Sequence, residues 1–434
     1  MSNGMSPPGS SGVSRLLLIL LCVGKLIWSF EVHVAPMVGY SNRHFRYLMR
    51  LLKSDAVLWS EMIKPAEVLQ ATIGRRAELL SRGQEHGMGP CIAQFGSDDA
   101  DELRQCCRLA AQFGYDQVSL NIGCPSVETN AHFGASLMRD PARVAMLLDS
   151  MADSSLALPV SIKCRIGIRE RYQDVREDRL ETLVDFVRTV TRSGAVRLVV
   201  VHARSAVLQG LDPEKNRSVP PLRYDFVEAL AREFPDVSII LNGGITSVNA
   251  SMLAPDSPLG GVMLGRAFLR RPLDILKTTV PASPGSPDAI ADGTILQYAR
   301  YAAREMATAP ASAIQVLLPL TLVFMSLHNR DGGEEPEQQQ PGPNATDDRR
   351  LKLVMQVMTP LLRQASASAS VLSSLRDIEA DLDEMGGYDR GDGGGGHDED
   401  EDAAIGRAAN RLAKLLKNFL GKKLVGKVRA NCAI

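Results

Sequence analysis

The chain has 434 residues, enough for one large α/β domain of roughly 250 residues and a smaller second unit. Its 49 Lys and Arg residues nearly cancel its 50 Asp and Glu residues, so net charge argues neither for nor against a nucleic-acid partner. Seven cysteines stand at 22, 91, 106, 107, 124, 164 and 432; the absence of a C-x-x-C spacing excludes that type of zinc site, and the odd count points to a reducing compartment.

The chain opens with a hydrophobic leader over residues 1–30. Arg15 precedes an apolar run from Leu16 to Gly24, and Lys25 follows it. The run is too short to span a bilayer comfortably, but it suits a signal-peptide core or the apolar part of an organellar presequence. A leader that is merely hydrophobic, or a misplaced start codon, explains it equally well. The sequence therefore leaves cytoplasm, plastid and mitochondrion open, and we expect no stable membrane association.

From Glu31 onward, strand-like runs rich in Val and Ile alternate with stretches of helical periodicity, which is typical of parallel strands covered on both faces. The eight runs are EVHVAPM, AVLWSEM, PCIAQFG, DQVSLNIGCP, PVSIKCRIG, RLVVVHAR, VSIILNGGI and GGVMLGRA. Eight such units within about 245 residues predict a TIM barrel over residues 31–280. An open doubly wound sheet is the alternative, but the first turn, APMVGYSNRHFR, lacks the glycine-rich dinucleotide fingerprint of that fold.

The active site of such a barrel lies at the C-terminal ends of its strands, so the residues that close each run are the candidates. These residues are Pro36, Met37, Glu61, Gln94, Asn121, Cys124, Lys163, Arg165, His202, Arg204, Asn242, Gly243, Gly244, Gly265 and Arg266. Taken singly, most have a structural explanation as a loop cap, a rim charge or a small core residue. Their convergence on one end of the barrel favours a functional site.

Two turns after the last two strands are suited to a phosphate. The glycines of NGGI let backbone N–H groups approach an anion, and Gly265 with Arg266 adds a cation at the usual phosphate site of these barrels. Lys163 and His202 face the remaining space, where a cation would stabilise a reduced flavin. FMN, with one phosphate and a planar ring, is the consistent cofactor, although a sugar-phosphate substrate would satisfy the same turns.

Taken together, the motifs resemble the tRNA-dihydrouridine synthases, specifically the branch typified by the bacterial A-type enzyme. The motifs are VAPM, LNIGCPS, IKCRIG, VHAR, LNGGI and GVMLGRA, in this order. The segment GLDPEKNRSVPPLRYDFV is similar to that branch's loop after strand six. The resemblance covers roughly Val32 to Leu276 and implies an FMN-dependent barrel that reduces uridines of tRNA, in the D-loop by analogy with the branch, to 5,6-dihydrouridine.

The resemblance also implies a mechanism. NADPH reduces FMN, flavin N5 passes a hydride to C6 of the uridine, and Cys124 protonates C5. A thiol can donate a proton near working pH, and the target base has to leave the folded tRNA to reach the flavin. Asn121, Arg165 and Arg204 are the expected substrate-binding residues. The expected cofactor-binding residues are Pro36, Met37, Val38, Gln94, Lys163, His202, Asn242, Gly243, Gly244, Gly265 and Arg266.

Two positions depart from the branch. Ser205 follows VHAR where the branch usually has a Lys, which removes a cation expected near the RNA. Ser136 replaces a second Cys that is common in the branch but absent from others, so we do not interpret it as loss of activity.

Beyond the barrel, the resemblance implies a small helical tRNA-binding domain, which we place in residues 281–327, 346–385 and 405–434. Two insertions rich in Gly, Gln, Pro and acidic residues, 328–345 and 386–404, should be disordered because they contain too little apolar surface to fold. The last helix is expected to be amphipathic. Its apolar face is Leu412, Leu415, Leu416, Phe419 and Leu420, and its basic residues are Arg411, Lys414, Lys417, Lys422 and Lys423. Such a face is more often solvated than bound to RNA, but the RNA-binding domain that the resemblance implies favours RNA contact here.

Two other functions remain open. A TIM-barrel lyase or isomerase acting on a phosphorylated small molecule could use Lys163 as a base or Schiff-base former. A non-catalytic tRNA chaperone would keep the fold without turnover, although the retained Cys124 argues against it. We expect a monomer that binds tRNA and requires no metal.

Overall fold

The computed structural model describes residues 30–83, 89–125, 133–152, 158–173, 178–248, 256–278, 287–308, 313–328 and 345–365, together with Met252 and single turns of chain at 376–378, 380, 407–408, 410–412 and 414–415. The leader up to residue 29 lies outside the described residues. So do the cores of both expected insertions, 329–344 and 386–404.

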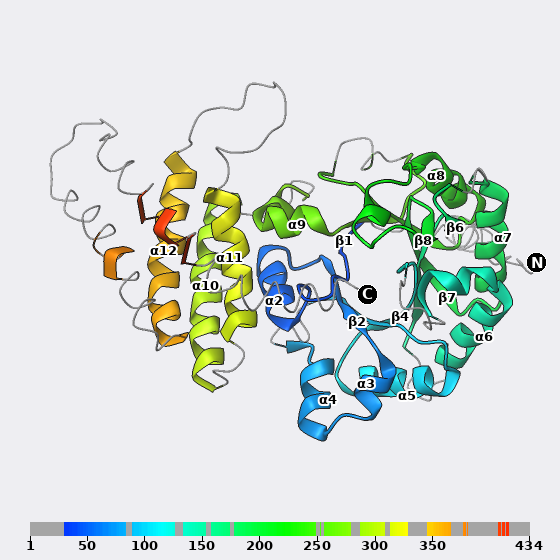
Figure 1. The fold of residues 1–434 in the computed structure, drawn as a ribbon, viewed down its shortest axis with the longest axis horizontal. Helices are drawn as coiled ribbons and strands as arrows, with labels where there is room; N and C mark the ends of the chain where they lie inside the picture. The colour runs from blue at the N-terminus through cyan, green and yellow to red at the C-terminus, as the bar shows by residue number, and fades with distance from the viewer. Residues whose placement is uncertain are drawn as a thin grey trace, which may run out of the picture.

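Eight parallel strands form a closed barrel in the order β1-β10-β9-β7-β5-β4-β3-β2 (Figure 1). All eight predicted strands are confirmed, and closure by pairing of β1 with β10 excludes the open sheet. The barrel strands are β1 (Glu31–Val34), β2 (Val57–Ile63), β3 (Cys91–Phe95), β4 (Gln117–Ile122), β5 (Val160–Arg165), β7 (Val196–His202), β9 (Ser238–Asn242) and β10 (Gly261–Leu264).

Helices cover the outside of the barrel, as expected for parallel strands joined by crossovers. Asp99 caps the N-terminus of α5 (Ala100–Gln112). Its side chain accepts hydrogen bonds from the backbone N–H groups of Asp101 and Glu102, both at 2.9 Å. The outer helices are α2 (Arg43–Leu52), α3 (Pro65–Leu69), α4 (Ile73–Leu80), α5 (Ala100–Gln112), α6 (Pro141–Ala152), α7 (Leu180–Thr191), α8 (Tyr224–Glu233) and α9 (Arg266–Arg270), with 3-10 turns η2 (Gly134–Arg139), η3 (Lys215–Arg217) and η4 (Pro272–Thr278).

Strand alternation separates the barrel interior from its outer face. The interior is filled by a small apolar cluster that includes Trp59, Ile92, Val200 and Ile240. Side chains two residues further along a strand point to the same side, so the strand-closing Gln94, His202 and Asn242 also face the barrel axis.

The same alternation along β4 and β5 directs Asn121, Lys163 and Arg165 inward, because the residues next to them in sequence belong to the large outer core.

The sequence did not predict a second, two-stranded parallel sheet formed by β6 (Ile168–Arg171) and β8 (Ala206–Gln209). These strands follow β5 and β7 almost directly. They extend two neighbouring barrel strands beyond the C-terminal end of the barrel, which we call the mouth. Each has four residues, too short for a period-2 pattern to stand out.

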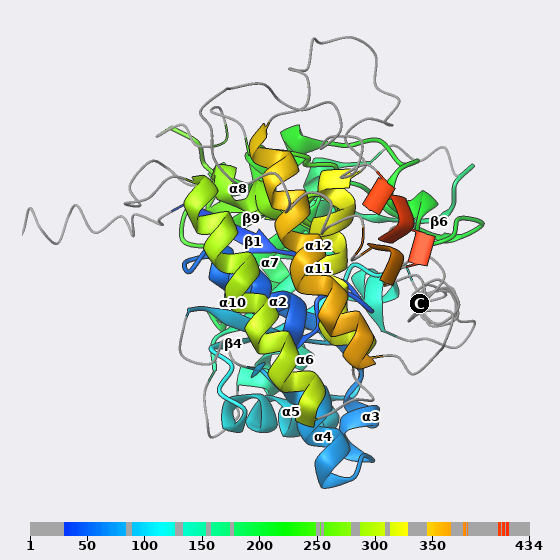
Figure 2. The same ribbon diagram turned by 90° about the vertical axis from the view of Figure 1, so that its left-hand side faces the viewer.

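Three helices pack together beside the barrel: α10 (Pro287–Thr308), α11 (Ala313–His328) and α12 (Ala345–Ala365) (Figure 2). The stretches GTILQYARYAAREMATA and DRRLKLVMQVMTPLLRQASA have helical periodicity, which predicts α10 and α12. Periodicity did not single out α11, which is apolar on nearly every side and carries Pro319 internally. At the far end, Leu412 and Leu415 are buried while Arg411 and Lys414 are exposed, as the amphipathic pattern predicts; the remaining residues of that pattern lie outside the described part of the chain.

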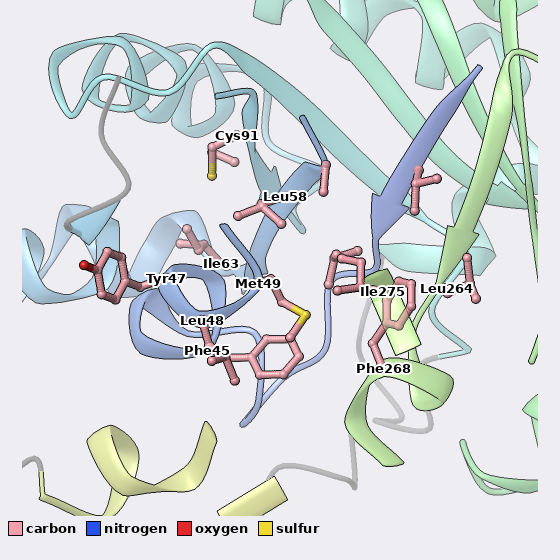
Figure 3. Packing of buried hydrophobic residues seen from close by; sticks show 14 of the residues in the cluster. Phe45, Tyr47, Leu48, Met49, Leu58, Ile63, Cys91, Leu264, Phe268 and Ile275 are labelled. Atoms are coloured by element: carbon pink, nitrogen blue, oxygen red, sulfur yellow. The ribbon is translucent and has the colours of Figure 1, made fainter. Parts of the chain in front are cut away.

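Helix α2 joins the barrel to these three helices. Its inner face contributes Phe45, Leu48 and Met49 to a core shared with Phe268 of α9 and Ile275 of η4 (Figure 3). Its outer face meets α10. There His44 Nδ1 lies 2.6 Å from the Tyr301 hydroxyl, Tyr47 packs on the Tyr301 ring at 4.4 Å between centroids, and Arg43 pairs with Glu305 at 2.6 Å. Within the described residues, no helix has the length and apolar character needed to cross a bilayer.

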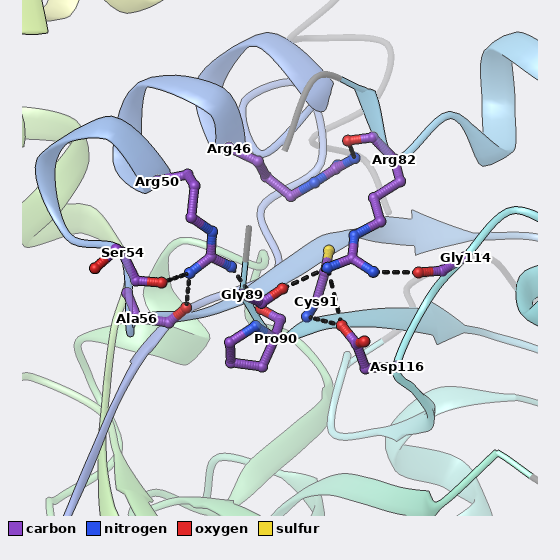
Figure 4. Close-up of polar contacts among 10 residues, drawn as sticks. All are labelled: Arg46, Arg50, Ser54, Ala56, Arg82, Gly89, Pro90, Cys91, Gly114 and Asp116. Carbon is purple, nitrogen blue, oxygen red and sulfur yellow. Dashed lines mark hydrogen bonds and ion pairs between the residues drawn. The ribbon is translucent and has the colours of Figure 1, made fainter. Parts of the chain in front are cut away.

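Buried arginines hold the N-terminal end of β3 (Figure 4). Arg50 of α2, 1% exposed, donates to the carbonyls of Ser54 (2.5 Å), Ala56 (2.7 Å) and Pro90 (2.7 Å). Arg82 donates to the carbonyls of Gly89 and Gly114 and pairs with Asp116 at 2.9 Å. A guanidinium group carries five N–H donors, so one arginine can donate to several backbone carbonyls at once.

We expect Arg50→Ala to lower the free energy of unfolding by about 3 kcal/mol, because three backbone carbonyls lose a charged donor in a buried setting. Chemical denaturation measures this loss. The matched control is Arg188→Ala, which removes an exposed arginine paired with Asp185 and Glu233 and should cost less than about 1 kcal/mol. Equal losses in the two variants would contradict a role for the buried arginine.

Candidate active site

The predicted site residues are distributed around the mouth in a definite order. Three strands lie between β4, which carries Asn121 and leads to Cys124, and β10, which leads to Gly265 and Arg266, whichever way round the barrel they are counted. In a ring of eight strands these two positions are opposite. β7 and β5, with His202 and Lys163, lie between them on one side. A ligand that contacts both the thiol and the glycine turns must therefore extend across the barrel axis.

A side-chain cap fixes the backbone at Cys124. Asn121 Oδ1 accepts hydrogen bonds from the N–H groups of Gly123 (3.1 Å) and Cys124 (3.0 Å), and its Nδ2 donates to Gln94 Oε1 at 2.9 Å. Short Asx turns of this kind let the chain leave a strand abruptly. The amide of Gln94 on β3 thus sets the orientation of the Asn121 amide, which in turn orients the thiol-bearing turn.

The carbonyl side of the same turn is also held. Cys124 O accepts from Ala135 N at 2.8 Å, and Gly123 O accepts from Arg165 Nε at 3.0 Å. Gly134 has φ +79°, and a Cβ there would lie 2.5 Å from Cys124 O, so glycine is required at this approach. Residues 126–132, which follow the turn, lie outside the described residues. The half-buried thiol is therefore presented on a backbone fixed from both sides.

Burial raises the pKa of the Cys124 thiol above its ordinary value, and the nearby charges of Arg165, Arg217 and Lys163 oppose that rise. The net direction is upward, so the thiol keeps its proton at neutral pH. A reactive nucleophilic cysteine needs the opposite shift. The environment of Cys124 accordingly suits a proton donor better than a nucleophile.

Lys163 lies in the middle of the mouth with no hydrogen bond or ion pair to another described residue. Burial, followed by the charge of Arg165, lowers the pKa of Lys163 to about 8. The ammonium remains mostly protonated at pH 7, and an anion placed beside it would raise that pKa again. Lys163 can therefore stabilise negative charge that appears on a bound ring.

The two expected substrate-binding arginines, Arg165 and Arg204, differ in burial. Arg165 is buried, with 4% of its surface exposed. Besides Gly123 O, it donates to the carbonyls of Asn216 (3.0 Å) and Ser205 (3.4 Å), so it joins three loops at the mouth. Burial lowers the pKa of Arg165 to about 10, which leaves it protonated. Arg204 is half-buried and donates to the carbonyl of Pro220.

Three buried polar atoms at the mouth have no hydrogen-bond partner among the described residues: Gln94 Nε2, His202 Nδ1 and Arg204 Nε. Burial, together with the surrounding charges of Arg165 and Lys163, lowers the pKa of His202 well below its usual range, so the ring is neutral. Buried polar groups are rarely left unpaired. An orphan amide donor and a neutral imidazole facing the barrel axis fit a ligand with heteroatoms at its edge.

The Gly243–Gly244 turn after β9 has the geometry expected for a phosphate. Gly243 and Gly244 adopt φ +108° and +67°, and a Cβ on Gly243 would lie 3.1 Å from the His202 ring. Tyr224 fixes this turn by donating to Gly243 O at 2.6 Å, and Asn242 Nδ2 donates to Met263 O at 2.7 Å. Successive backbone N–H groups in such conformations form anion-binding concavities.

The turn after β1 closes the ring of predicted residues. Ser41 accepts from Met37 N at 2.8 Å and donates to Met37 O at 3.2 Å, while Gly39 N donates to Glu61. A Cβ on Gly265 would lie 3.3 Å from Met37 Sδ, so the β1 and β10 turns are in contact. Pro36, Met37 and Val38 are half-buried at this edge of the mouth.

These features suit a ligand that has a phosphate, a polar ring edge and a ring that becomes negative on reduction. The Gly243–Gly244 turn would meet the phosphate, the unpartnered Gln94 Nε2 and His202 Nδ1 the ring edge, and Lys163 the charge on the ring. In the described residues, no group of three or more His, Cys, Asp or Glu side chains is placed to hold a metal ion.

Sequence reasoning missed several supporting residues. Ser60 accepts from Gln94 N at 2.9 Å, Tyr224 holds the Gly243 turn, and Asn216 receives a hydrogen bond from Arg165. None closes a barrel strand. Tyr224 and Asn216 both lie in the segment GLDPEKNRSVPPLRYDFV, which marked the branch without indicating what its residues contact.

Comparison with known proteins agrees with this geometry. A family model described as dihydrouridine synthase matches residues 33–306. The chain belongs to this family. Three proteins named tRNA-dihydrouridine(20/20a) synthase are among its relatives. The one from Shewanella oneidensis is 41% identical over 240 residues, covering 55% of this chain and 67% of the relative; that from Xylella fastidiosa is 41% identical over 247 residues (56% and 68%); that from Escherichia coli K12 is 38% identical over 275 residues (63% and 75%).

Both departures from the branch pattern have local partners in this dihydrouridine synthase family member. Ser205 is fully buried and donates to Asp178, which also pairs with Arg169 at 2.9 Å. Ser136 donates to Phe133 O at 3.1 Å. Ser205 therefore has a structural contact in the β6–β8 region and is not available on the surface.

We expect Cys124 to react with iodoacetamide more slowly than a free cysteine peptide between pH 7 and 9, because only the thiolate reacts and burial raises the thiol pKa. The rate should increase as the pH rises past the ordinary range for cysteine. Mass spectrometry of the Cys124 peptide measures the rate, with the free peptide as reference. Faster reaction than the reference at pH 7 would show a stabilised thiolate and contradict the proton-donor assignment.

Proposed function

We propose that this protein is an FMN-dependent enzyme that uses NADPH to reduce uridines of tRNA to 5,6-dihydrouridine. The observation that carries the proposal is the Cys124 thiol, whose pKa is raised by burial, held on a fixed turn across the barrel mouth from the glycine turns that follow β9 and β10. The relatives' names support the substrate, and their positions 20 and 20a favour uridines of the D-loop.

We assign FMN to the mouth by matching its parts to these residues. Gly243, Gly244 and Gly265 offer backbone N–H groups to the phosphate, with Arg266 beside them. Lys163 and the free amide donor of Gln94 serve the ring, and His202 contacts it from β7. Asn242 supports the phosphate turn through its bond to Met263, and Pro36, Met37 and Val38 line the edge along β1.

Reduction of the uracil C5–C6 double bond requires a hydride at one carbon and a proton at the other. When bound, FMN supplies the hydride to C6, with electrons from NADPH. Cys124 donates its proton to C5 and becomes a thiolate. The positive charges of Arg165, Arg217 and Lys163 stabilise that thiolate. Solvent then reprotonates the thiolate, because the raised pKa favours the thiol.

The remaining assigned groups hold the nucleotide. Asn121 Nδ2 donates one of its two hydrogens to Gln94 Oε1, and the second hydrogen can bind the uracil edge. Arg204 adds positive charge at the rim, and Arg165 acts from its buried position through the loops that it joins. The helices α10 to α12, with the basic segment beyond them, provide a further surface for tRNA.

The second candidate, a lyase or isomerase on a phosphorylated small molecule, is favoured by one observation. The lowered pKa of Lys163, about 8, would make its amine more available for a Schiff base. A lyase or isomerase reaction of this kind gives no role to the unpartnered Gln94 amide or to a protonated Cys124. Flavin content separates the two.

The first experiment is an absorbance spectrum of the purified full-length protein under anaerobic conditions. We expect flavin bands that bleach with NADPH and recover only after unmodified tRNA is added, because substrate reoxidises the cofactor. A colourless protein that cannot be loaded with FMN would overturn the proposal and favour the lyase.

We expect Cys124→Ala to remain folded and yellow, with normal NADPH bleaching, while dihydrouridine formation falls by about 10²- to 10⁴-fold, the range for loss of a general acid. Nucleoside analysis of treated tRNA measures the product. Cys107→Ala, in the buried face of α5, is the matched control and should keep near-normal turnover. Equal turnover in the two variants would remove Cys124 from the mechanism.

A further inference from the structure

Glu61 is the candidate residue of the mouth that the proposed function leaves without a role. It stands near the C-terminal end of β2 and is half-buried. Its carboxylate accepts a hydrogen bond from Gly39 N, which lies in the turn after β1 and 22 positions earlier in the chain. A side chain of β2 therefore holds the backbone of the neighbouring β1 turn.

A bulge in β2 takes Glu61 out of the regular pairing with β3. The pairing is regular up to Trp59 and resumes at Met62, and between these positions β2 has two residues where β3 has one. Ser60 closes the gap, because its hydroxyl accepts from Gln94 N at 2.9 Å and donates to the carbonyl of Glu61 at 2.7 Å. Bulges re-aim side chains and are common beside active sites. Here the bulge directs the Glu61 carboxylate to the β1 turn.

The turn that runs from Met37 to Ser41 satisfies three of its five N–H groups with its own acceptors. Met37 N donates to the Ser41 hydroxyl at 2.8 Å. The N–H groups of Tyr40 and Ser41 both donate to Met37 O at 2.9 Å. The two remaining N–H groups, those of Val38 and Gly39, have no acceptor within the turn.

Glu61 supplies the acceptor that Gly39 lacks. Gly39 has φ +84°, the left-handed region that glycine adopts readily, and a Cβ there would meet nothing within 4 Å. The glycine is therefore needed for the path of the backbone, and the charge-assisted hydrogen bond to Glu61 stabilises that path. Val38 N–H is then the one N–H group of this turn that has no partner among the described residues.

The bulge lies between two elements that the proposed function assigns to the cofactor. β2 pairs with β1 on one side and with β3 on the other. On the β1 side, Glu61 fixes the turn that carries Val38 N–H. On the β3 side, Ser60 fixes the backbone of Gln94, whose Nε2 has no partner among the described residues. One extra residue in β2 thus holds two elements that each carry a donor without a described partner.

We propose that Glu61 is a positioning residue for the flavin: its carboxylate fixes the β1 turn so that Val38 N–H donates a hydrogen bond to the edge of the isoalloxazine ring. The inference rests on the proposed function, since it takes FMN as the ligand. A turn that is fixed before the ligand arrives loses little conformational freedom on binding. The bond from Gly39 to Glu61 therefore contributes to FMN affinity without any contact between Glu61 and the cofactor.

The test compares the full-length wild type with Glu61→Ala, Glu61→Gln and the control Glu78→Ala, which removes an exposed carboxylate paired with Arg75 on α4. FMN is removed from each protein, and its affinity is measured by titrating it back and following the quenching of its fluorescence. The visible absorbance bands of the bound flavin and the thermal unfolding of the FMN-free protein are recorded separately, so that no readout depends on turnover.

We expect Glu61→Ala to weaken FMN binding about tenfold, the size expected when one hydrogen bond to a charged group is lost. The flavin bands should shift as well, because the ring edge loses its donor. Glu61→Gln should stay within about threefold of wild type, because its side-chain carbonyl can still accept from Gly39 N. Glu78→Ala should match wild type in both measurements.

Two outcomes would overturn the inference. Unchanged FMN affinity and flavin bands in Glu61→Ala, with earlier unfolding of the FMN-free protein, would make Glu61 a structural anchor only. Equal weakening in the Ala and Gln variants would show that the charge matters and the acceptor does not. Failure of the proposed function looks different: the wild type would bind FMN and form no dihydrouridine, while the order of the variants in FMN affinity would still report the contact. A wild type that binds no FMN would overturn both.

Discussion

Closure of the barrel by the pairing of β1 with β10 is the constraint on which the site depends. Closure gives every strand an inner and an outer face, and strict alternation then places Gln94, Lys163 and His202 on the same axis although about 110 residues separate the first from the last. The apolar interior beneath them, which includes the fully buried Trp59, keeps this polar layer at one end. The mouth is therefore polar by geometry, and its chemistry depends on which residues end each strand.

Burial and the charges at the mouth together set the protonation states of Cys124 and Lys163. Burial raises the pKa of the Cys124 thiol and lowers that of Lys163, while the surrounding arginines oppose the first shift and reinforce the second. The thiol is a neutral acid and the lysine remains a cation at neutral pH. A site with this pattern is preorganised for an anionic ligand and for proton donation, which general acid catalysis requires.

Helix α2 links the site to the rest of the molecule. The helix starts after the Asn42 cap, just beyond the turn that follows β1. It ends near Arg50, which binds backbone carbonyls at the opposite end of the barrel. Its outer face packs on α10 through Tyr47 and Tyr301. The helices beside the barrel are consequently fixed to the element that begins at the mouth, so a tRNA held by those helices would have a defined position relative to the site.

The sequence by itself determined the eight strands, because runs of Val and Ile broken by helical periodicity leave few other folds, and it determined which residues close each strand. It also indicated a phosphate at the glycine turns, because that signal is local. The acid role of Cys124 followed from the family resemblance and stays a prediction. Only the tertiary structure revealed that Gln94 orients Asn121, that Arg165 joins three loops and that the Arg217 side chain has no hydrogen bond or ion pair with another described residue. Those contacts join residues 27 to 51 positions apart, and whether a side chain is paired or free is decided by neighbours that no local pattern specifies. The β6–β8 pair and α11 were missed for related reasons: short strands have too few residues for a period, and a helix that is apolar all round has no polar face to give one.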